Sequence, residues 1–516
     1  MVPLVVGAFV YQQRETVASA QLLDEVLRIT ASRYVDSVPP NDLYEKAAKG
    51  LVKQLNDPYS VLWTKAEYDQ FSQQTGGKYG GIGMEIAPTN PVTVQRVFPH
   101  TPAAAGGVME GDRILKVDTA NARGWTTTQV SDKLKGDPGT TVNVEFGRSG
   151  VNEPIPMKFT RAIVHIPAVP YTLVFGNIGY IPLQQFNETA AQEVADAVTD
   201  VTKHGATKIV FDMRGNPGGF LDQAIATSNL FLPVGKSILS VRGRTGEVQA
   251  YSATDTPEAP TIPMVVLVDP HTASASEIVA GALQDHDRAL IMGTTSFGKG
   301  LVQSLYKLDG GYALKMTTAK WYTPSGRSIQ VERKLLPDGE FVEVTPDSLE
   351  TDSARRARPK YKSDAGRIVY GGGGITPDII VKPDTLSTPE QKLLQSLAPK
   401  SQIFAQELQD YAGEMKSKVK ENFTVTPQMR NDFIARLKAK GVTVDSMLLA
   451  QGGSTELDRL LGVRITSMAF GDSATKRKYL DDDNQLQRAL DALKGVQNTQ
   501  GLFALAQKAQ GVASVR

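Results

Sequence analysis

Two side chains of this 516-residue chain have the types and surroundings for nucleophilic chemistry. Ser274 follows an apolar strand pattern, Met264–Val268, and precedes a helical pattern with apolar residues on one face over residues 278–283. A helix start has unpaired backbone N–H groups, and its dipole favours negative charge. Lys299 lies on a glycine turn, Ser296–Gly300. The pair indicates a nucleophile and its base.

A structural interpretation competes with this catalytic one. Ser274 and Glu277 fit the S-x-x-E pattern of a capping box, in which the serine only satisfies backbone donors. Lys299 taken alone fits a solvated surface lysine. Spacing by itself leaves both interpretations open.

Composition limits the classes of protein to which the chain can belong. With 41% hydrophobic and 22% charged residues it is an ordinary globular protein, and its length predicts roughly three or four domains. A net charge of +1 gives no bulk attraction to nucleic acid. The lack of cysteine excludes disulfides and thiol catalysis, and the five histidines lack metal-ligand spacing. We therefore expect no metal and no cofactor.

A glycine-rich segment, Gly76–Ile86, begins a stretch of β patterning. Thr101–Gly106 then predicts a short helix, and Gly111–Val117 predicts a strand. These three motifs in this order resemble a PDZ domain over residues 76–160. Such a module captures a chain-terminal carboxylate on backbone N–H groups and pairs the peptide with an exposed strand, here 84–87. A β-domain that binds nothing is the alternative. The resemblance implies peptide binding by Gly80, Gly81, Ile82, Gly83, Met84 and Lys135, although Lys135 also fits a solvated charge.

Strand and helix patterns alternate from Ile178–Leu183 onward and predict an α/β core with both faces of its sheet covered. The strand pattern Lys208–Met213 runs into Arg214–Gly219, a glycine turn that fits the presentation of N–H groups to an oxyanion. The turn lacks the GxxxxGK[ST] and GxGxxG patterns of nucleotide sites.

The segments in order resemble the carboxyl-terminal processing peptidases, also called tail-specific proteases, over about residues 17–385. The resemblance implies a serine endopeptidase with an α/β catalytic core of crotonase/ClpP-like ββα units. It also implies that the PDZ domain recognises the C-terminal tails of protein substrates. The matching segments are the PDZ-like region, Arg214–Gly219, Thr272–Glu277, Phe297–Gly300 and Gly373–Asp378.

The same resemblance assigns roles to individual residues. Ser274 is the implied nucleophile, Lys299 the general base, and Gln303 the residue that orients the lysine. The other implied positions are Gly218 or Gly219 together with Ala275 for the oxyanion hole, and Asp285 as a structural acid.

Acid–base chemistry agrees with a lysine base. A free lysine has a pKa of about 10.4, which burial can bring to roughly 7–8. Neutral Lys299 would take the Ser274 proton and later give it to the leaving amine. The Gln303 amide would fix the lysine without adding charge. His271 and His286 lie three residues before Ser274 and about three turns along its helix, so a histidine base is the less favoured alternative.

The chain divides into five expected regions. Residues 1–16 fit the remnant of a signal or membrane anchor, or else a short buried or disordered end. The remaining regions are a helical 17–75, a PDZ domain at 76–160, a peptidase core at 161–385 and a C-terminal helical domain at 386–516. Helical patterns in the last region cover 391–418, 428–440, 455–468, 475–493 and 502–509.

These residues and motifs fit three functions to different degrees. Intact Ser274, Lys299 and Gln303 favour a peptidase that processes or degrades proteins in the bacterial cell envelope, in the periplasm or another extracytoplasmic place. A catalytically silent or adaptor-dependent PDZ scaffold is the alternative. A small-molecule enzyme on a crotonase-like core fits the PDZ-like segment poorly. The helical ends further indicate docking on the core or a homo-oligomer.

Overall fold

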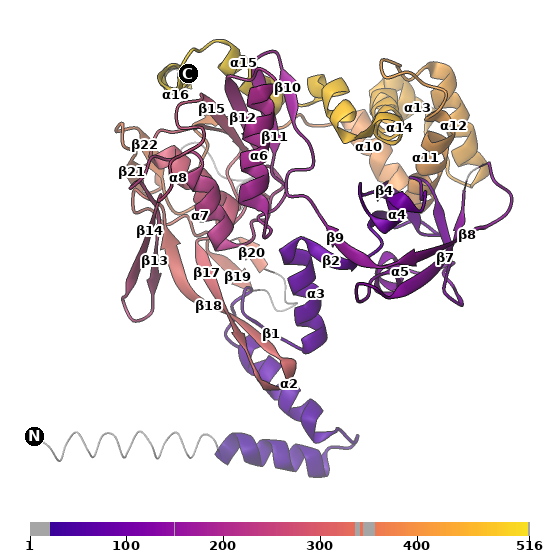
Figure 1. Cartoon of the computed structure of the whole chain (residues 1–516), viewed down its shortest axis with the longest axis horizontal. Helices are drawn as coiled ribbons and strands as arrows, with labels where there is room; N and C mark the ends of the chain where they lie inside the picture. The colour runs from indigo at the N-terminus through magenta and orange to yellow at the C-terminus, as the bar shows by residue number, and fades with distance from the viewer. Residues whose placement is uncertain (1–20, 149, 336–340, 344–356, 514–516) are drawn as a thin grey trace, which may run out of the picture.

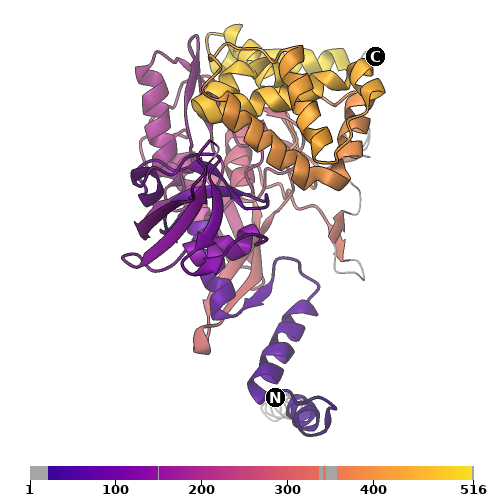
Figure 2. The same cartoon turned by 90° about the vertical axis from the view of Figure 1, so that its right-hand side faces the viewer.

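The computed structural model describes residues 21–148, 150–335, 341–343 and 357–513 (Figure 1). Residues 1–16, with their expected anchor remnant, lie outside these ranges. Among the described residues, no helix is both long and apolar enough to cross a membrane. The N-terminal elements are a helix over residues 21–33, α2 (Pro40–Lys53), β1 (Val61–Trp63) and α3 (Lys65–Gly76). The first two of these helices extend away from the rest of the chain (Figures 1 and 2).

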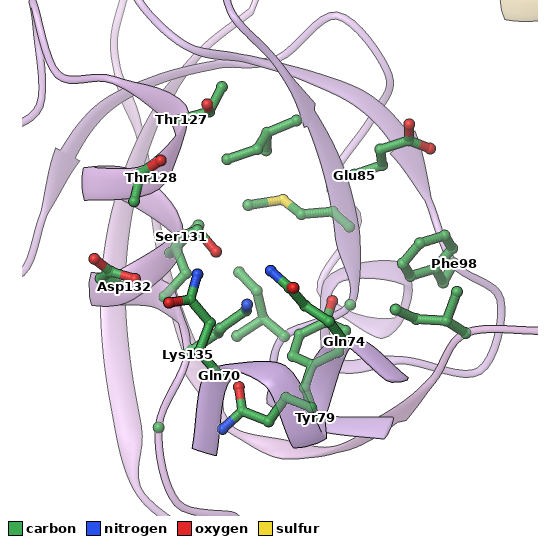
Figure 3. Close-up of a pocket in the computed structure, with 18 of the residues that line it drawn as sticks. Gln70, Gln74, Tyr79, Glu85, Phe98, Thr127, Thr128, Ser131, Asp132 and Lys135 are labelled. Atoms are coloured by element: carbon green, nitrogen blue, oxygen red, sulfur yellow. The ribbon is translucent and has the colours of Figure 1, made fainter. Parts of the chain in front are cut away.

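A β-rich region follows and contains the groove drawn in Figure 3. Its sheet has the strand order β3-β4-β5-β7-β8, with β6 paired to β5, around its own apolar core. A separate two-stranded ribbon, β2 with β9, connects this region to the rest of the chain. The elements are β2 (Lys78–Gly81), β3 (Met84–Ala87), β4 (Thr93–Val97), α4 (Pro102–Ala105), β5 (Arg113–Val117), β6 (Ala120–Asn121), α5 (Thr127–Leu134), β7 (Thr141–Gly147), β8 (Ile155–Thr160) and β9 (Ala162–His165).

The catalytic candidates lie on a mixed six-stranded sheet with the order β10-β11-β12-β15-β16-β23, in which only β10 is antiparallel to its neighbour. Its central strands are buried along their whole length, as expected for a sheet covered on both faces. The elements are β10 (Leu173–Phe175), β11 (Ile178–Pro182), α6 (Ala190–Lys203), β12 (Lys208–Asp212), α7 (Leu221–Asn229), β15 (Met264–Val268), α8 (Ala275–Asp285), β16 (Leu290–Gly293) and β23 (Ile379–Ile380).

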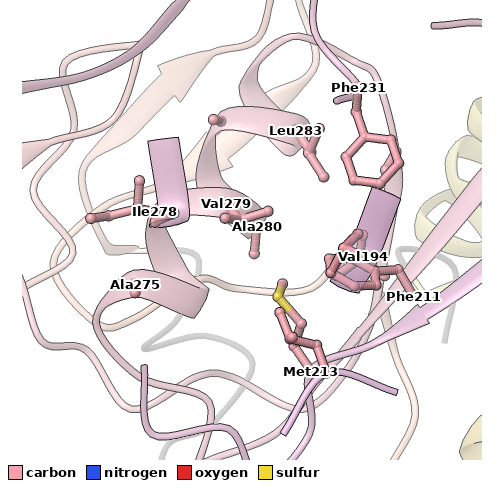
Figure 4. Close-up of a cluster of buried hydrophobic side chains, with 14 of the residues drawn as sticks. Val194, Phe211, Met213, Phe231, Ala275, Ile278, Val279, Ala280 and Leu283 are labelled. Atoms are coloured by element: carbon pink, nitrogen blue, oxygen red, sulfur yellow. The ribbon is translucent and has the colours of Figure 1, made fainter. Parts of the chain in front are cut away.

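Helices α6, α7 and α8 cover one face of this sheet. Their apolar side chains pack with alternate residues of the strands, including Phe211 and Val266 (Figure 4). Helix α8 is buried at every residue, because it lies between the sheet and the neighbouring strands. The position of Ser274 at its start is therefore fixed by the core.

The opposite face is covered by the end of the chain, α15 (Asn484–Lys494) and α16 (Thr499–Ala513). Leu490 and Leu493 join a cluster with Val265 and Leu267, which point to this face by strand alternation. Lys208 Nζ also donates to the Leu493 carbonyl at 2.8 Å. The last part of the chain is thus a layer of the α/β core itself.

A second sheet lies beside α8, with the order β1-β18-β13-β14 and β17 also paired to β18. Strand β17 was not predicted from the sequence, and β1 joins this sheet from the N-terminal region. The elements are β13 (Ser237–Gly243), β14 (Val248–Ser252), β17 (Leu301–Lys307), β18 (Ala313–Tyr322), and the short pairs β19 (Arg333–Leu335) with β20 (Phe341–Glu343) and β21 (Lys360–Lys362) with β22 (Ile368–Tyr370).

Helices α10 to α14 form a bundle with its own apolar core next to the β-rich region (Figures 1 and 2). Gln409 Nε2 donates to the Val94 carbonyl at 3.4 Å, and Lys416 Nζ to the Glu110 carbonyl at 3.4 Å. The bundle contains α10 (Thr388–Leu397), α11 (Ser401–Met415), α12 (Pro427–Ala439), α13 (Ser446–Leu448) and α14 (Ser454–Lys478).

The expected single helix over 475–493 is wrong. Helix α14 ends at Lys478, and α15 starts anew where the Asp483 side chain accepts the Leu486 N–H at 3.0 Å. Asp483 also pairs with Arg214 on the catalytic sheet at 2.8 Å. This N-cap and ion pair separate the bundle from the layer that covers the sheet.

Candidate active site

Ser274 lies at the N-cap of α8, directly after the turn that ends β15, and is half-buried. Its backbone has φ 55° and ψ −114°. A positive φ is rare for a residue with a side chain and costs about 1–3 kcal/mol. The surrounding contacts must therefore hold this conformation, which presents the side chain at the end of the helix.

The glycine turn after β12 packs directly against Ser274. A Cβ built on Gly218 would lie 2.9 Å from Ser274 Cβ and 2.7 Å from the Ala273 carbonyl oxygen, and Gly218 has φ +95°. Asn216 is fully buried and fixes the turn, because its Nδ2 donates to the Leu183 carbonyl while its own carbonyl accepts the Ala273 N–H. Only glycine fits at position 218.

The backbone N–H groups around Ser274 differ in whether they are free. Gly218 N–H donates to Asn216 Oδ1 at 2.9 Å, and Ser274 N–H donates to Glu277 Oε2 at 2.8 Å. Within the described part of the chain, the N–H groups of Gly219 and Ala275 have no acceptor. These two are the donors that remain available to an oxyanion.

Glu277 joins Ser274 to the turn that carries Lys299. Its carboxylate is fully buried and accepts hydrogen bonds from Ser274 N–H at 2.8 Å, Ser296 Oγ at 2.5 Å, Gly298 N–H at 2.6 Å and Lys299 N–H at 2.9 Å. Burial raises the pKa of Glu277, and the four donors oppose that rise. The sequence suggested Glu277 only as a helix cap, and its link to the lysine turn carries no local signal.

Lys299 has its backbone fixed but its ammonium unbonded. Within the described residues, Nζ donates no hydrogen bond, to Ser274 Oγ or to any other acceptor, and it lies 4.8 Å from the ring centroid of Tyr59. Burial, followed by the charge of Lys315, lowers the pKa of Lys299 to about 8, while Glu277 and Asp57 act in the opposite direction. A lysine with this pKa is partly neutral near physiological pH.

Gln303 lies on β17, and its Nε2 donates to Thr317 Oγ1 at 3.3 Å on β18. The Gln303 amide therefore bonds to the neighbouring strand β18, and this hydrogen bond is not to Lys299. The two histidines near Ser274 in sequence do not reach it. His271 is exposed, and both ring nitrogens of His286 are bonded, to Asp364 at 2.9 Å and to the Ser237 carbonyl at 2.7 Å.

No group of three or more His, Asp or Glu side chains in the described ranges is arranged to hold a metal ion. Asp285 lies at the far end of α8 and pairs with Arg327 at 2.8 Å, with both side chains buried.

The groove of the β-rich region lies between β3 and α5 and has a volume of about 820 Å³. It is lined by Ile82, Gly83, Met84 and Lys135, as the sequence implied, and Lys135 Nζ lies 5.5 Å from the Tyr79 ring centroid. Gly80 and Gly81 instead pair with β9, so the loop at the groove is shorter than expected. Helix α3 contributes Gln70 and Gln74 to the same groove (Figure 3).

Comparison with protein-family models agrees with this arrangement. Residues 177–348 match peptidase family S41, residues 70–145 match the PDZ domain, and residues 9–66 match the N-terminal domain of the activating protease CtpB. The chain is a serine peptidase with a PDZ domain.

Individual relatives define the family more closely. The carboxy-terminal-processing protease of Bartonella bacilliformis is 39% identical over 312 residues, which cover 59% of this chain and 71% of the relative. The carboxy-terminal processing protease CtpA of Bacillus subtilis is 34% identical over 58% of this chain and 64% of the relative. The chain belongs to the carboxy-terminal processing protease family. A solved photosystem II D1 C-terminal processing protease is 28% identical over 64% of this chain and 91% of its own, with a TM-score of 0.36.

Replacing the linking carboxylate tests its role. In Glu277→Gln, an amide N–H₂ replaces one of the oxygens that accept backbone N–H groups. We expect the free energy of unfolding in urea to fall by about 1.5–3 kcal/mol, the range for a hydrogen bond to a charged group. Peptidase turnover should fall as well. Glu247→Gln changes an exposed carboxylate and is the matched control. Equal stability of the two variants would contradict the role of Glu277.

Proposed function

We propose that this chain cleaves protein substrates whose C-terminal tails it holds in the groove, with Ser274 as nucleophile and Lys299 as general base. The observation that carries the proposal is the joint placement of both residues by Glu277. They lie beside two backbone N–H groups that have no acceptor among the described residues. Tail capture would raise the local concentration of the substrate at the site. The substrate class comes from the family and the groove.

The proposed reaction uses each part of the site once. Neutral Lys299 Nζ takes the proton of Ser274 Oγ as the oxygen attacks the scissile carbonyl carbon. The N–H groups of Gly219 and Ala275 stabilise the oxyanion. When the C–N bond breaks, the lysine ammonium gives its proton to the leaving amine, and water then hydrolyses the acyl-enzyme by the same route. Gln303 would orient the lysine after leaving Thr317.

A second candidate function is supported by the contact that Lys299 makes: its Nζ lies over the Tyr59 ring. Among the described residues Lys299 Nζ makes no hydrogen bond to Ser274 Oγ, and we infer that this conformation is that of a resting site. A PDZ scaffold that becomes active only when peptide or an adaptor protein binds accounts for this geometry. A permanently silent scaffold is the limiting case.

We also propose bounds for the domains of the chain and a location for it in the cell. We assign residues 17–75 to an N-terminal helical region, 76–160 to the PDZ domain, 161–385 to a crotonase/ClpP-like core and 386–516 to a C-terminal helical region. The last two helices of that region, α15 and α16, cover the core. Membership of the family favours an extracytoplasmic site of action, in the periplasm of a bacterium. Fractionation of the producing cells tests it, and a purely cytoplasmic protein would contradict it.

Removing either side chain of the dyad tests the chemistry. Ser274→Ala and Lys299→Met should each lower kcat/KM on a fluorogenic peptide with a free carboxylate by at least roughly 1,000-fold, because each removes a group that takes part in bond making. Lys307→Met, at an exposed lysine, is the control and should keep full activity. Cleavage by Lys299→Met at the wild-type rate would refute the lysine base.

The pH dependence follows from the protonation state of the base. Only neutral Lys299 accepts a proton, so kcat/KM should rise with pH through a midpoint near the pKa of about 8 and fall below it. Since the charge of Lys315 lowers the pKa of Lys299, Lys315→Met should move the midpoint to higher pH. Lys320→Met removes an exposed lysine of the same strand and should leave the midpoint unchanged. If Lys315→Met leaves the pH midpoint of kcat/KM unchanged, Lys299 is not the group that titrates.

The N-terminal helix supports a proposal of self-association. Leu22, Val26 and Ile29 share one face of the helix over residues 21–33 and are exposed by 64%, 52% and 47%. An exposed apolar stripe of this kind marks an interface. We expect light scattering to give the mass of a homo-oligomer for the full chain and a smaller mass for Leu22→Asp/Ile29→Asp. Arg28→Glu, on another face, is the control, and a monomeric wild type would disprove the interface.

A further inference from the structure

Residues 57–76, which we name the strap, run from the candidate base to the peptide groove. The strap consists of the turn 57–60, β1 and α3. At one end Tyr59 covers the ammonium of Lys299, and at the other Gln70 and Gln74 line the groove.

The catalytic end of the strap is fixed by specific hydrogen bonds. Asp57 accepts from Tyr59 N–H at 3.1 Å and from Ser60 Oγ at 2.5 Å. Ser60 Oγ in turn accepts the Thr317 N–H of β18 at 3.0 Å. Thr317 Oγ1 is the group that holds Gln303. The turn therefore bonds to the residue that keeps Gln303 on β18 and covers Lys299 as well.

The middle of the strap is held together by strand pairing and an aromatic stack. Strand β1 pairs with β18, with Leu62 opposite Leu314. Trp63 stacks on Phe71 of α3 with ring centroids 4.3 Å apart, and Lys315 lies over the Trp63 ring at 4.9 Å. Because this stack joins β1 to α3, a displacement of the helix carries the strand and the turn with it.

The groove end of the strap is exposed to whatever binds there. Gln70 and Gln74 extend from α3 into the groove beside Tyr79 and Lys135 of the PDZ region (Figure 3). The carbonyl of Gln74 accepts a hydrogen bond from Gln185 Nε2 at 3.2 Å. A peptide laid along β3 would contact both glutamines.

We propose that the strap couples occupation of the groove to the active site and that Tyr59 is the residue that positions Lys299. In the resting state the ring of Tyr59 holds the ammonium away from Ser274 by a cation–π contact. A bound tail displaces α3, the strap shifts along β18, and Tyr59 and Thr317 release Lys299 and Gln303 to each other. This mechanism rests on the proposed peptidase function and explains how the groove would regulate it.

Substitution of the ring is the first test, in the full chain. The activator is a synthetic decapeptide with a C-terminal valine and a free carboxylate, which suits the apolar lining by Ile82, Met84 and Leu134; its C-terminal amide is the control. Activity is followed on an internal fluorogenic peptide without a free carboxylate. We expect the decapeptide to raise wild-type kcat at least fivefold. Tyr59→Phe, which keeps the ring, should retain that rise.

Tyr59→Leu keeps an apolar cover but removes the ring. It should bind the decapeptide within twofold of wild type, measured by fluorescence anisotropy, while its kcat no longer responds to the peptide. Its pH midpoint should also move to lower pH, because the ring no longer favours the charged lysine. A merely structural role would change stability without moving the midpoint. If the decapeptide still raises the kcat of Tyr59→Leu fivefold, the proposed role of the strap is wrong.

A reversible lock provides the second test. The native chain has no cysteine, so Leu62→Cys/Leu314→Cys can form a single disulfide. The two residues are opposite each other on antiparallel strands, which places their Cα atoms within the range that a disulfide spans. The oxidised enzyme should lose the peptide-induced rise, and dithiothreitol should restore it in the same sample. A rise that persists after oxidation overturns the proposal.

Different results would contradict the peptidase function and the role of the strap. A wild-type chain that cleaves no peptide, with or without the decapeptide, overturns the peptidase function and the strap together. A wild type whose Ser274-dependent cleavage is fully active without the decapeptide leaves the peptidase intact and overturns the strap alone.

Discussion

One buried carboxylate constrains the whole candidate site. Glu277 has no exposed surface, and its oxygens are filled by one serine hydroxyl and three backbone N–H groups. A buried charge is tolerated only when its lone pairs are occupied, so both segments that supply donors must hold their shape. The N–H groups of Gly298 and Lys299 lie 21 and 22 residues further along the chain. The backbone distance between nucleophile and base is thus fixed, and only the lysine side chain is free to change its position.

The same carboxylate stabilises a strained backbone. Ser274 has a positive φ, which costs about 1–3 kcal/mol, and a single hydrogen bond to a charged group contributes a comparable amount. The bond from Ser274 N–H to Glu277 therefore offsets the strain, and the buried Asn216 holds the preceding residue through its carbonyl. Ala275 N–H, the next donor along the chain, has no acceptor within the described residues. Ala275 is the first residue of α8, and the first N–H groups of a helix have no partner within the helix.

Local sequence patterns predicted individual strands and helices, but not the contacts between distant parts of the chain. Five successive apolar residues predicted β15 at Met264–Val268, which are its observed bounds. The resemblance to a known family, and not spacing alone, assigned catalytic roles to Ser274 and Lys299. The layer formed by α15 was not foreseen, because an amphipathic pattern does not state which distant face it covers. The contact of Tyr59 with Lys299 joins residues about 240 positions apart, and it has no periodicity by which it could be found. The occupied N–H of Gly218 likewise depends on one side-chain rotamer.

The balance of energies around Lys299 explains why an aromatic ring suits this position better than an acid. A pKa of about 8 in place of 10.5 corresponds to roughly 3 kcal/mol against the charged form. A carboxylate in contact with Nζ would reverse that shift and keep the lysine protonated. A cation–π contact contributes only about 0.5–2 kcal/mol, so burial still prevails. The Tyr59 ring can thus direct the resting ammonium without preventing its deprotonation, and a lysine released from the ring enters the site with its affinity for protons already lowered.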